Sequence, residues 1–76
     1  MKSKVELYTI EKVKEYRKKA DNMSIRYFAD CLNVSHQFIC EIEKPEERTA
    51  YNLDHLNEIA KLLKCKLWDL IPEYPL

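Results

Sequence analysis

The sequence has no glycine, only three cysteines and no long apolar run, and each of these shortages excludes a class of protein. Without glycine the chain cannot form a Gly-rich phosphate-binding loop, and its turns must use Asn, Asp, Lys or Pro. No apolar run approaches the roughly 18 residues that a transmembrane helix needs. The N-terminal stretch MKSKVELYTI also lacks the apolar segment of a signal peptide, so we expect a cytoplasmic protein that contacts no membrane.

The cysteines, Cys31, Cys40 and Cys65, are odd in number and are expected to be free thiols. Cys31, His36 and Cys40 lie close enough in sequence to suggest zinc. They flank a turn, however, and lack a near fourth ligand, whereas structural zinc needs four convergent ligands. A Cys–His nucleophile would need a third orienting group and a pocket. We therefore expect no metal, no cofactor and no enzymatic activity.

The 76 residues suffice for one domain, and 13 basic residues balance 13 acidic ones. A chain of this size buries only about 60% of its unfolded surface, so dimerisation would help to stabilise it. Zero net charge is not the usual signature of a nucleic-acid-binding domain. The charge is uneven, because residues 1–19 carry seven Lys or Arg against three Glu, whereas residues 20–43 carry one Arg against four acids.

Apolar residues recur at helical spacing along most of the chain, which predicts an all-α bundle of five helices. The expected helices cover residues 9–20, 24–32, 35–43, 52–64 and 65–71. Thr9 is the expected cap of the first, and residues 1–8 are predicted to form an arm or a short strand. Pro72 ends the last helix, so the bundle spans residues 9–71 and a tail follows. Leu67, Trp68 and Leu70 are expected either to close the bundle or to form a dimer interface.

Residues 24–43, SIRYFADCLNVSHQFICEIE, have the pattern of a helix-turn-helix. Ser24 and Ser35 are suited to cap two short helices, because a serine oxygen accepts from free backbone N–H groups. Asn33 stands where the chain leaves the first helix, and Asn tolerates the left-handed conformation used there. The second helix of such a motif usually enters a DNA groove.

The ordered motifs resemble the Xre/Cro family of phage-repressor-type helix-turn-helix domains. The matching segments are Tyr16-Arg17 for Leu-Arg, Phe28-Ala29 for Leu-Ala, Leu32-Asn33-Val34-Ser35 for Leu-Gly-Val-Ser, Ile39-Cys40-Glu41-Ile42-Glu43 for Ile-Ser-x-Ile-Glu, and Leu56 to Leu63 for Leu-x-x-Ile-Ala-x-x-Leu. The resemblance covers Ile10 to Ile71 and implies a lambda-repressor-like, five-helix DNA-binding domain. The chain departs from the family at Ile25, where a Gln is common, and at Lys44-Pro45, where a Gly is common.

Four residues of the expected recognition helix occupy positions that reach base edges in the major groove. They are His36, Gln37, Cys40 and Glu41. Gln37 can bind adenine through two hydrogen bonds, and Glu41 can accept from the cytosine amino group. The alternative is a solvated helix face with no partner.

Phosphate contacts are expected from helix caps and from flanking basic residues, which position a protein on DNA without reading sequence. The candidates are Ser24, Arg26, Ser35, Lys44, Arg48, Thr49 and Asn52. For the Ser and Asn residues, the alternative role is helix capping alone, and the two roles can coexist.

The resemblance also implies a structural ion pair between Arg17 and Glu43, because the family often pairs these two positions. A partly buried pair of this kind would hold the end of the first helix to the end of the third. Loss of one partner would cost a few kcal/mol, because the other charge would stay buried.

The predicted function is a repressor-like transcription regulator that binds double-stranded DNA in a sequence-specific manner. It would act as a homodimer on half-sites about one helical turn apart. The alternative is a protein-interaction module with the same fold, such as an antitoxin or anti-repressor, which binds DNA weakly or not at all. The zero net charge and the acidic middle segment favour this alternative.

Overall fold

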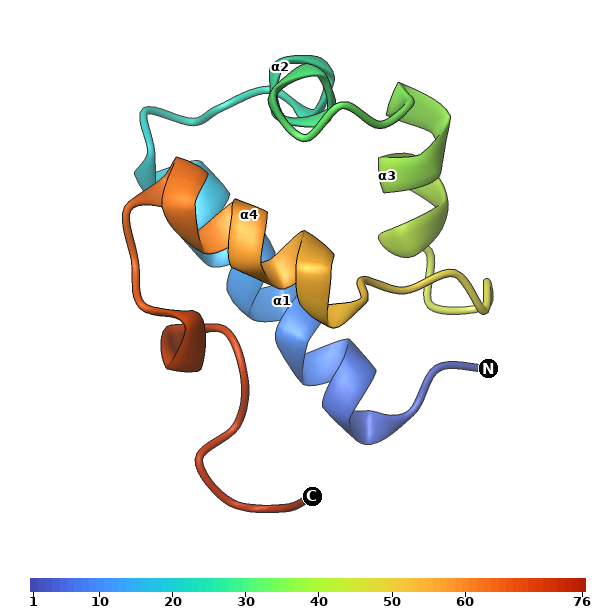
Figure 1. Ribbon diagram of the computed structural model, residues 1–76. Coiled ribbons are helices and arrows are strands. Elements are labelled where there is room, and N and C mark those ends of the chain that lie inside the picture. The colour runs from blue at the N-terminus through green and yellow to red at the C-terminus, as the bar shows by residue number, and fades with distance from the viewer.

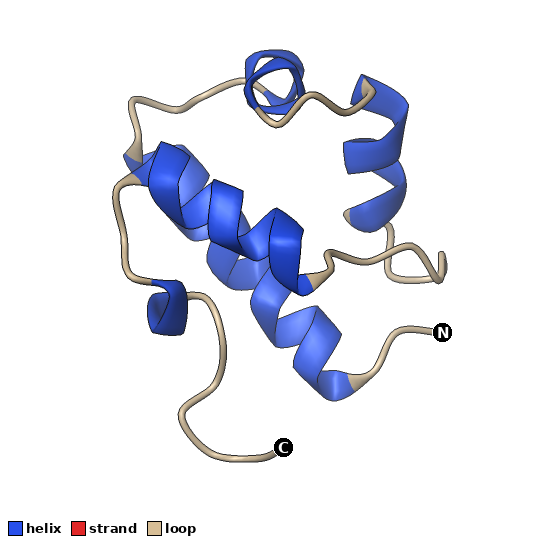
Figure 2. Cartoon of the chain, in the orientation of Figure 1, coloured by secondary structure: helices blue, strands red, loops and turns tan.

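The computed structural model describes residues 1–76 and contains helices and loops but no strand (Figure 2). The helices are α1 (Lys4–Lys19), α2 (Ile25–Cys31), α3 (His36–Ile42), α4 (Leu53–Leu63) and a short 3-10 helix, η1 (Leu67–Asp69). The prediction of an all-α chain is thus confirmed. In Figure 1, α3 lies on one side of α4, and η1 with the C-terminal tail lies on the other. None of these helices is long and apolar enough to span a bilayer.

Helix α1 begins at Lys4, so the prediction of an arm or short strand at residues 1–8 is wrong. Ser3 is the N-cap: its Oγ accepts from the Glu6 backbone N–H at 3.1 Å, and Glu6 Oε1 accepts from the Ser3 N–H at 2.8 Å. This reciprocal capping box satisfies two backbone donors that would otherwise be free. Thr9, the expected cap, is buried inside the helix instead. Polar and apolar residues alternate over residues 4–8, and this pattern suggested a strand. The capping box of Ser3 and Glu6 starts a helix there instead.

Helices α2 and α3 are joined by a short turn whose geometry follows from Asn33. This residue has φ 58°, and the next N–H, that of Val34, donates back to the Ala29 carbonyl at 3.0 Å. The pattern is a Schellman-type helix end, which usually places Gly at the left-handed position. Because the chain has no glycine, Asn33 and three other residues adopt positive φ: Asp21, Asn22 and Lys64.

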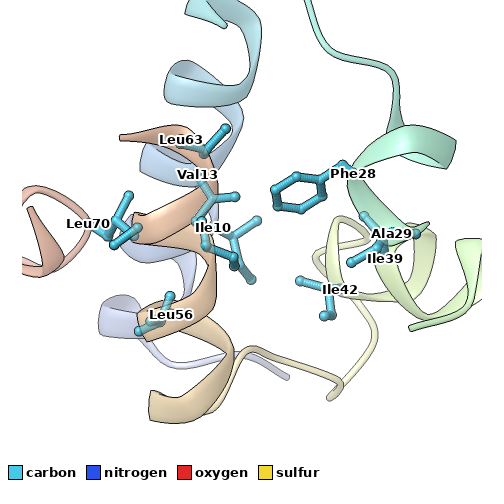
Figure 3. Close-up of a cluster of buried hydrophobic side chains, with 11 residues drawn as sticks. Ile10, Val13, Phe28, Ala29, Ile39, Ile42, Leu56, Leu63 and Leu70 are labelled. Carbon is cyan, nitrogen blue, oxygen red and sulfur yellow. The ribbon is translucent and has the colours of Figure 1, made fainter. Parts of the chain in front are cut away.

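The core is one cluster of buried apolar side chains drawn from all four α-helices and from the segment after α4 (Figure 3). Its members are Ile10, Val13, Phe28, Ala29, Ile39, Ile42, Leu56, Ile59, Ala60, Leu63 and Leu70. Phe28 and Ala29 of α2 lie close to Ile39 of α3 in Figure 3. Burial of these side chains fixes the rotation of α3, and therefore decides which of its residues face outward.

The helix expected at residues 65–71 is present only as the three-residue η1. Lys64, with φ 55°, ends α4 in a left-handed conformation, and Asp69 Oδ2 accepts from the Lys66 N–H at 2.9 Å. A 3-10 turn this short can direct only part of its side chains inward. Leu70 is fully buried and closes the bundle, whereas Trp68 is 70% exposed and Leu67 41% exposed. The closing role predicted for all three residues therefore belongs to Leu70 alone.

Candidate nucleic-acid interface

The outer face of α3 brings together the four residues predicted to contact bases. His36 and Gln37 are exposed, and Cys40 and Glu41 are half-buried, while Ile39 and Ile42 on the opposite face are buried. The four form two neighbouring pairs across one helical turn, at the spacing where side chains on a helix meet. The face is therefore a compact polar surface with a fixed orientation.

Both pairs on this face are in contact. Gln37 Nε2 donates to Glu41 Oε2 at 3.3 Å, and Cys40 Sγ lies 3.7 Å from Nδ1 and 3.8 Å from Nε2 of His36. The bond to Glu41 orients the Gln37 amide and leaves its oxygen and its second N–H free. One acceptor and one donor side by side are what an adenine edge requires.

The seven predicted phosphate-contacting residues fall into two groups. Ser24, Ser35 and Asn52 are N-caps whose oxygens accept from the N–H groups of Tyr27 at 3.1 Å, Phe38 at 3.0 Å and His55 at 2.8 Å. Capping is thus their observed role, and it leaves the other N–H groups of each first turn available. The other group comprises Arg26, Lys44 and Arg48, which are exposed, and Thr49, which is half-buried.

The loop between α3 and α4 is held by Lys2, a residue that sequence reasoning missed. Its side chain is buried, and its ammonium donates to the carbonyl oxygens of Lys44 and Glu47. A charged donor to two carbonyls is a strong tether, because hydrogen bonds to ions are about twice as strong as neutral ones. A lysine near a chain end is usually solvated, and no local sequence pattern marks a contact with residues more than forty positions away.

The predicted ion pair between Arg17 and Glu43 is formed. Arg17 Nη2 lies 3.5 Å from Glu43 Oε2, and the two side chains are only 10% and 12% exposed. Arg17 Nη1 also donates to the Met23 carbonyl at 2.7 Å, so the guanidinium joins α1, the segment before α2 and the end of α3. The pair fixes the C-terminal end of α3 against the bundle.

Tyr51, in the segment before α4, lies near the ion pair of Arg17 and Glu43. Its hydroxyl is buried without a hydrogen-bond partner. Burial raises the pKa of Tyr51 well above its usual range, the charge of Glu43 raises the pKa further, and Arg17 opposes the shift. Tyr51 is therefore neutral near pH 7 and adds no charge to the ion pair of Arg17 and Glu43.

Three aromatic rings, those of Phe38, Tyr51 and His55, pack α3 against the start of α4. The ring centroid of His55 lies 5.3 Å from that of Phe38 and 6.2 Å from that of Tyr51. His55 Nδ1 also accepts from the Asn52 N–H at 3.1 Å, so His55 takes the place that Glu or Gln usually occupies in a capping box. Sequence reasoning missed this role because histidine is not the residue expected at that position.

Two of the five lysines of α1 are paired with glutamates of the same helix. Lys12 lies 3.5 Å from Glu15, and Lys14 lies 3.9 Å from Glu11, both on the surface of the same helix.

Arg26 and Arg48 lie outside all four ion pairs of the structure. Exposed Glu46 and Glu47 accompany Lys44 and Arg48 in the loop before α4, so the flank of α3 carries mixed charge.

No group of three or more His, Cys, Asp or Glu side chains is placed to hold a metal, and all three cysteines are free thiols. The largest cavity, of about 690 Å³, lies between α1 and the C-terminal segment and includes none of the predicted DNA-contacting residues. Its lining residues are Tyr8, Lys12, Tyr16, Trp68, Asp69, Ile71, Pro72 and Glu73.

Comparisons with known proteins found no match for this chain. No protein-family model, no curated protein and no solved structure matches the chain. The case for a candidate interface on α3 therefore rests on the chain's own residues and their contacts.

Proposed function

We propose that this protein is a sequence-specific DNA-binding regulator of the helix-turn-helix type, with α3 as the helix that enters the major groove. The observation that carries the proposal is the polar outer face of α3, His36, Gln37, Cys40 and Glu41, set on a helix whose inner face is locked into the core. Recognition helices need this combination, because base edges can be read only by side chains held in register.

Gln37 is the main candidate for base reading. Its amide is exposed and is oriented by Glu41, with a donor and an acceptor still free. In this arrangement Glu41 positions Gln37 through Oε2, and its second carboxylate oxygen, Oε1, stays free to accept from a cytosine amino group.

Phosphate binding is proposed for Arg26 of α2, for Lys44 and Arg48 of the loop before α4, and for Thr49 beside them. The free N–H groups at the start of α4, next to Asn52, add a partial positive charge. Lys2 supports this surface indirectly, because it holds the loop that carries Lys44. Few phosphates are neutralised by one copy of the chain, so affinity is expected to depend on two copies binding together.

We also propose that the chain forms a homodimer through apolar residues at the starts of α1 and α4 and in the segment after η1. Leu53 is 75% exposed, Val5 is 41% exposed and Ile71 is 37% exposed, and all three line a mainly apolar groove of about 160 Å³. Burial of this patch between two copies would remove apolar surface from water and would double the number of DNA contacts.

The test is selection of the purified protein against random duplex DNA, followed by binding measurements at two salt concentrations. We expect an enriched palindrome with half-sites about one helical turn apart. Gln37→Ala should lose about 1–3 kcal/mol of discrimination at one base pair, whereas Arg48→Ala should weaken all sequences alike and reduce the salt slope by about 1. Absence of any enriched site, with negligible affinity at low salt, would refute the proposal.

A protein-interaction module remains the second candidate, and one observation favours it. The outer face of α3 carries no Lys or Arg, and its flanking loop carries two exposed acids. A surface of mixed charge suits a protein partner better than a polyanion. The selection experiment separates the two, since this candidate expects no enriched site and no salt-dependent affinity for DNA.

A further inference from the structure

His36 and Cys40 form the only thiol–imidazole contact in the molecule. They occupy successive turns of α3, His36 is exposed, and Cys40 is half-buried at the same surface. We propose that these two side chains form an open, two-ligand site for a thiophilic divalent cation of the zinc class. The site has no third protein ligand, which distinguishes it from a structural zinc centre with four.

The two side chains are close enough for one ion to bridge them, although Sγ is almost equally far from both ring nitrogens and the ring must turn to direct one of them at the ion. Zinc–sulfur and zinc–nitrogen bonds of about 2.3 and 2.0–2.1 Å, held at a tetrahedral angle, place the two ligand atoms about 3.6 Å apart. The observed separations of Cys40 Sγ from the ring nitrogens of His36 are 3.7 and 3.8 Å. Because the ring is exposed, it can turn to direct one nitrogen at the ion without disturbing the buried face of α3.

The ligand chemistry also selects the class of ion. Thiolate and imidazole ligands favour zinc and its soft relatives over magnesium and calcium, which prefer oxygen. On binding, the neutral imidazole donates a lone pair and the Cys40 thiol releases one proton to solvent. The remaining coordination positions are filled by water, so the ion exchanges readily.

The other thiols provide matched controls within the same chain. Cys31 is exposed at the end of α2, and its interaction with the nearby Tyr27 hydroxyl raises the pKa of that tyrosine. Cys65 is half-buried after α4, and burial, assisted by the charge of Asp69, raises the pKa of its thiol. Neither thiol contacts an imidazole.

A cation held here would regulate the proposed DNA reading, and this consequence rests on the proposed function. The hydrated ion would stand on the face that has to enter the groove, next to Gln37. It would hold the His36 ring away from base edges and would obstruct close approach of α3. Saturation of the site should therefore reduce affinity for the selected DNA sequence.

The direct test needs no DNA. Titration of the reduced, metal-free protein with Cd²⁺ should produce the ultraviolet charge-transfer band of a cadmium thiolate. Cys40→Ser should abolish the band at one equivalent. His36→Ala should weaken binding at least about tenfold, the loss typical of even an outer-sphere partner. Cys31→Ser and Cys65→Ser should bind as the unchanged protein does. Circular dichroism should show that all four variants fold, because none of these residues is one of the buried core side chains, although Cys65 packs against them.

The proposal is overturned if His36→Ala binds Cd²⁺ as tightly as the unchanged protein, or if the band follows Cys31 or Cys65. A second measurement then compares DNA affinity with and without Zn²⁺. The unchanged protein should lose affinity, and His36→Ala should not respond to the ion. An equal response of both proteins would overturn the regulatory role. If the protein binds no DNA at all, the proposed function fails, while the Cd²⁺ titration still decides the metal site.

Discussion

At the scale of single residues, the buried pair of Arg17 and Glu43 has an exposed counterpart in the same chain. Lys12 and Glu15 lie at the same 3.5 Å separation, but their side chains are 33% and 53% exposed. Comparison of the two pairs isolates the effect of burial from that of distance. Charges removed from water depend on their partners far more than charges that water can solvate.

Glu43→Gln is therefore expected to lower the free energy of unfolding by about 3 kcal/mol, because the Arg17 guanidinium would stay buried without its counter-ion. Glu15→Gln should change it by less than about 0.5 kcal/mol. Urea unfolding followed by far-ultraviolet circular dichroism measures both. Equal effects in the two variants would show that the buried pair has no special structural role.

Lys2 gives a second prediction for a single side chain. Lys2→Met keeps most of the apolar stem but removes the donor to the Lys44 and Glu47 carbonyls. We expect a loss of about 1–3 kcal/mol, the usual effect of leaving buried polar groups unpaired. Hydrogen exchange should show faster opening of residues 44–48. Unchanged exchange there would mean that the loop holds its shape without the tether.

At the scale of elements, the sequence predicted the interior helices well and the ends poorly. Helices α2 and α3 lie where their serine caps and apolar stripes placed them, because local and tertiary preferences agree. The errors lie at both ends of the chain. Residues 4–8 alternate like a strand yet extend α1, and residues 65–71 have helical spacing yet form one 3-10 turn. The secondary structure of short segments at the chain ends depends more on capping and turn hydrogen bonds than on the spacing of apolar residues.

Helix ends without glycine give a prediction at this scale. Lys64 ends α4 with φ 55°, a conformation that costs an L-residue roughly 1–2 kcal/mol and that glycine adopts freely. Lys64→Gly should raise stability by about 1 kcal/mol, or the melting temperature by roughly 4–8 °C. Lys61→Gly, inside the same helix, should lower stability by about 1 kcal/mol. A destabilising Lys64→Gly would show that this strain is compensated by contacts of the lysine side chain.

The candidate interface could be predicted only in outline. Spacing identified the outward face of α3, because the apolar residues between the polar ones had to turn inward. The hydrogen bond from Gln37 to Glu41 and the contact of Cys40 with His36 depend on side-chain conformations that spacing does not determine. Lys2 joins segments more than forty positions apart, and no local pattern marks such a contact.

At the scale of the whole molecule, the exposed apolar patch formed by Val5, Leu53 and Ile71 tests the proposed dimer. Leu53→Glu should give a monomer in light scattering at concentrations where the unchanged protein is dimeric. Folding should be preserved, because Leu53 is 75% exposed in the single chain. If dimerisation is required for DNA affinity, binding should weaken in parallel. A dimer that persists in Leu53→Glu would place the contact elsewhere, with Trp68 and Leu67 the next surface to examine.

The position of Trp68 has a consequence for spectroscopy. It is the sole tryptophan of the chain, it is 70% exposed on η1, and its ring lies 5.4 Å from the Lys66 ammonium. Its indole is already hydrated in the native state, so its emission will change little when the four α-helices melt. Intrinsic fluorescence would thus report the local environment of the C-terminal segment and would underreport global unfolding.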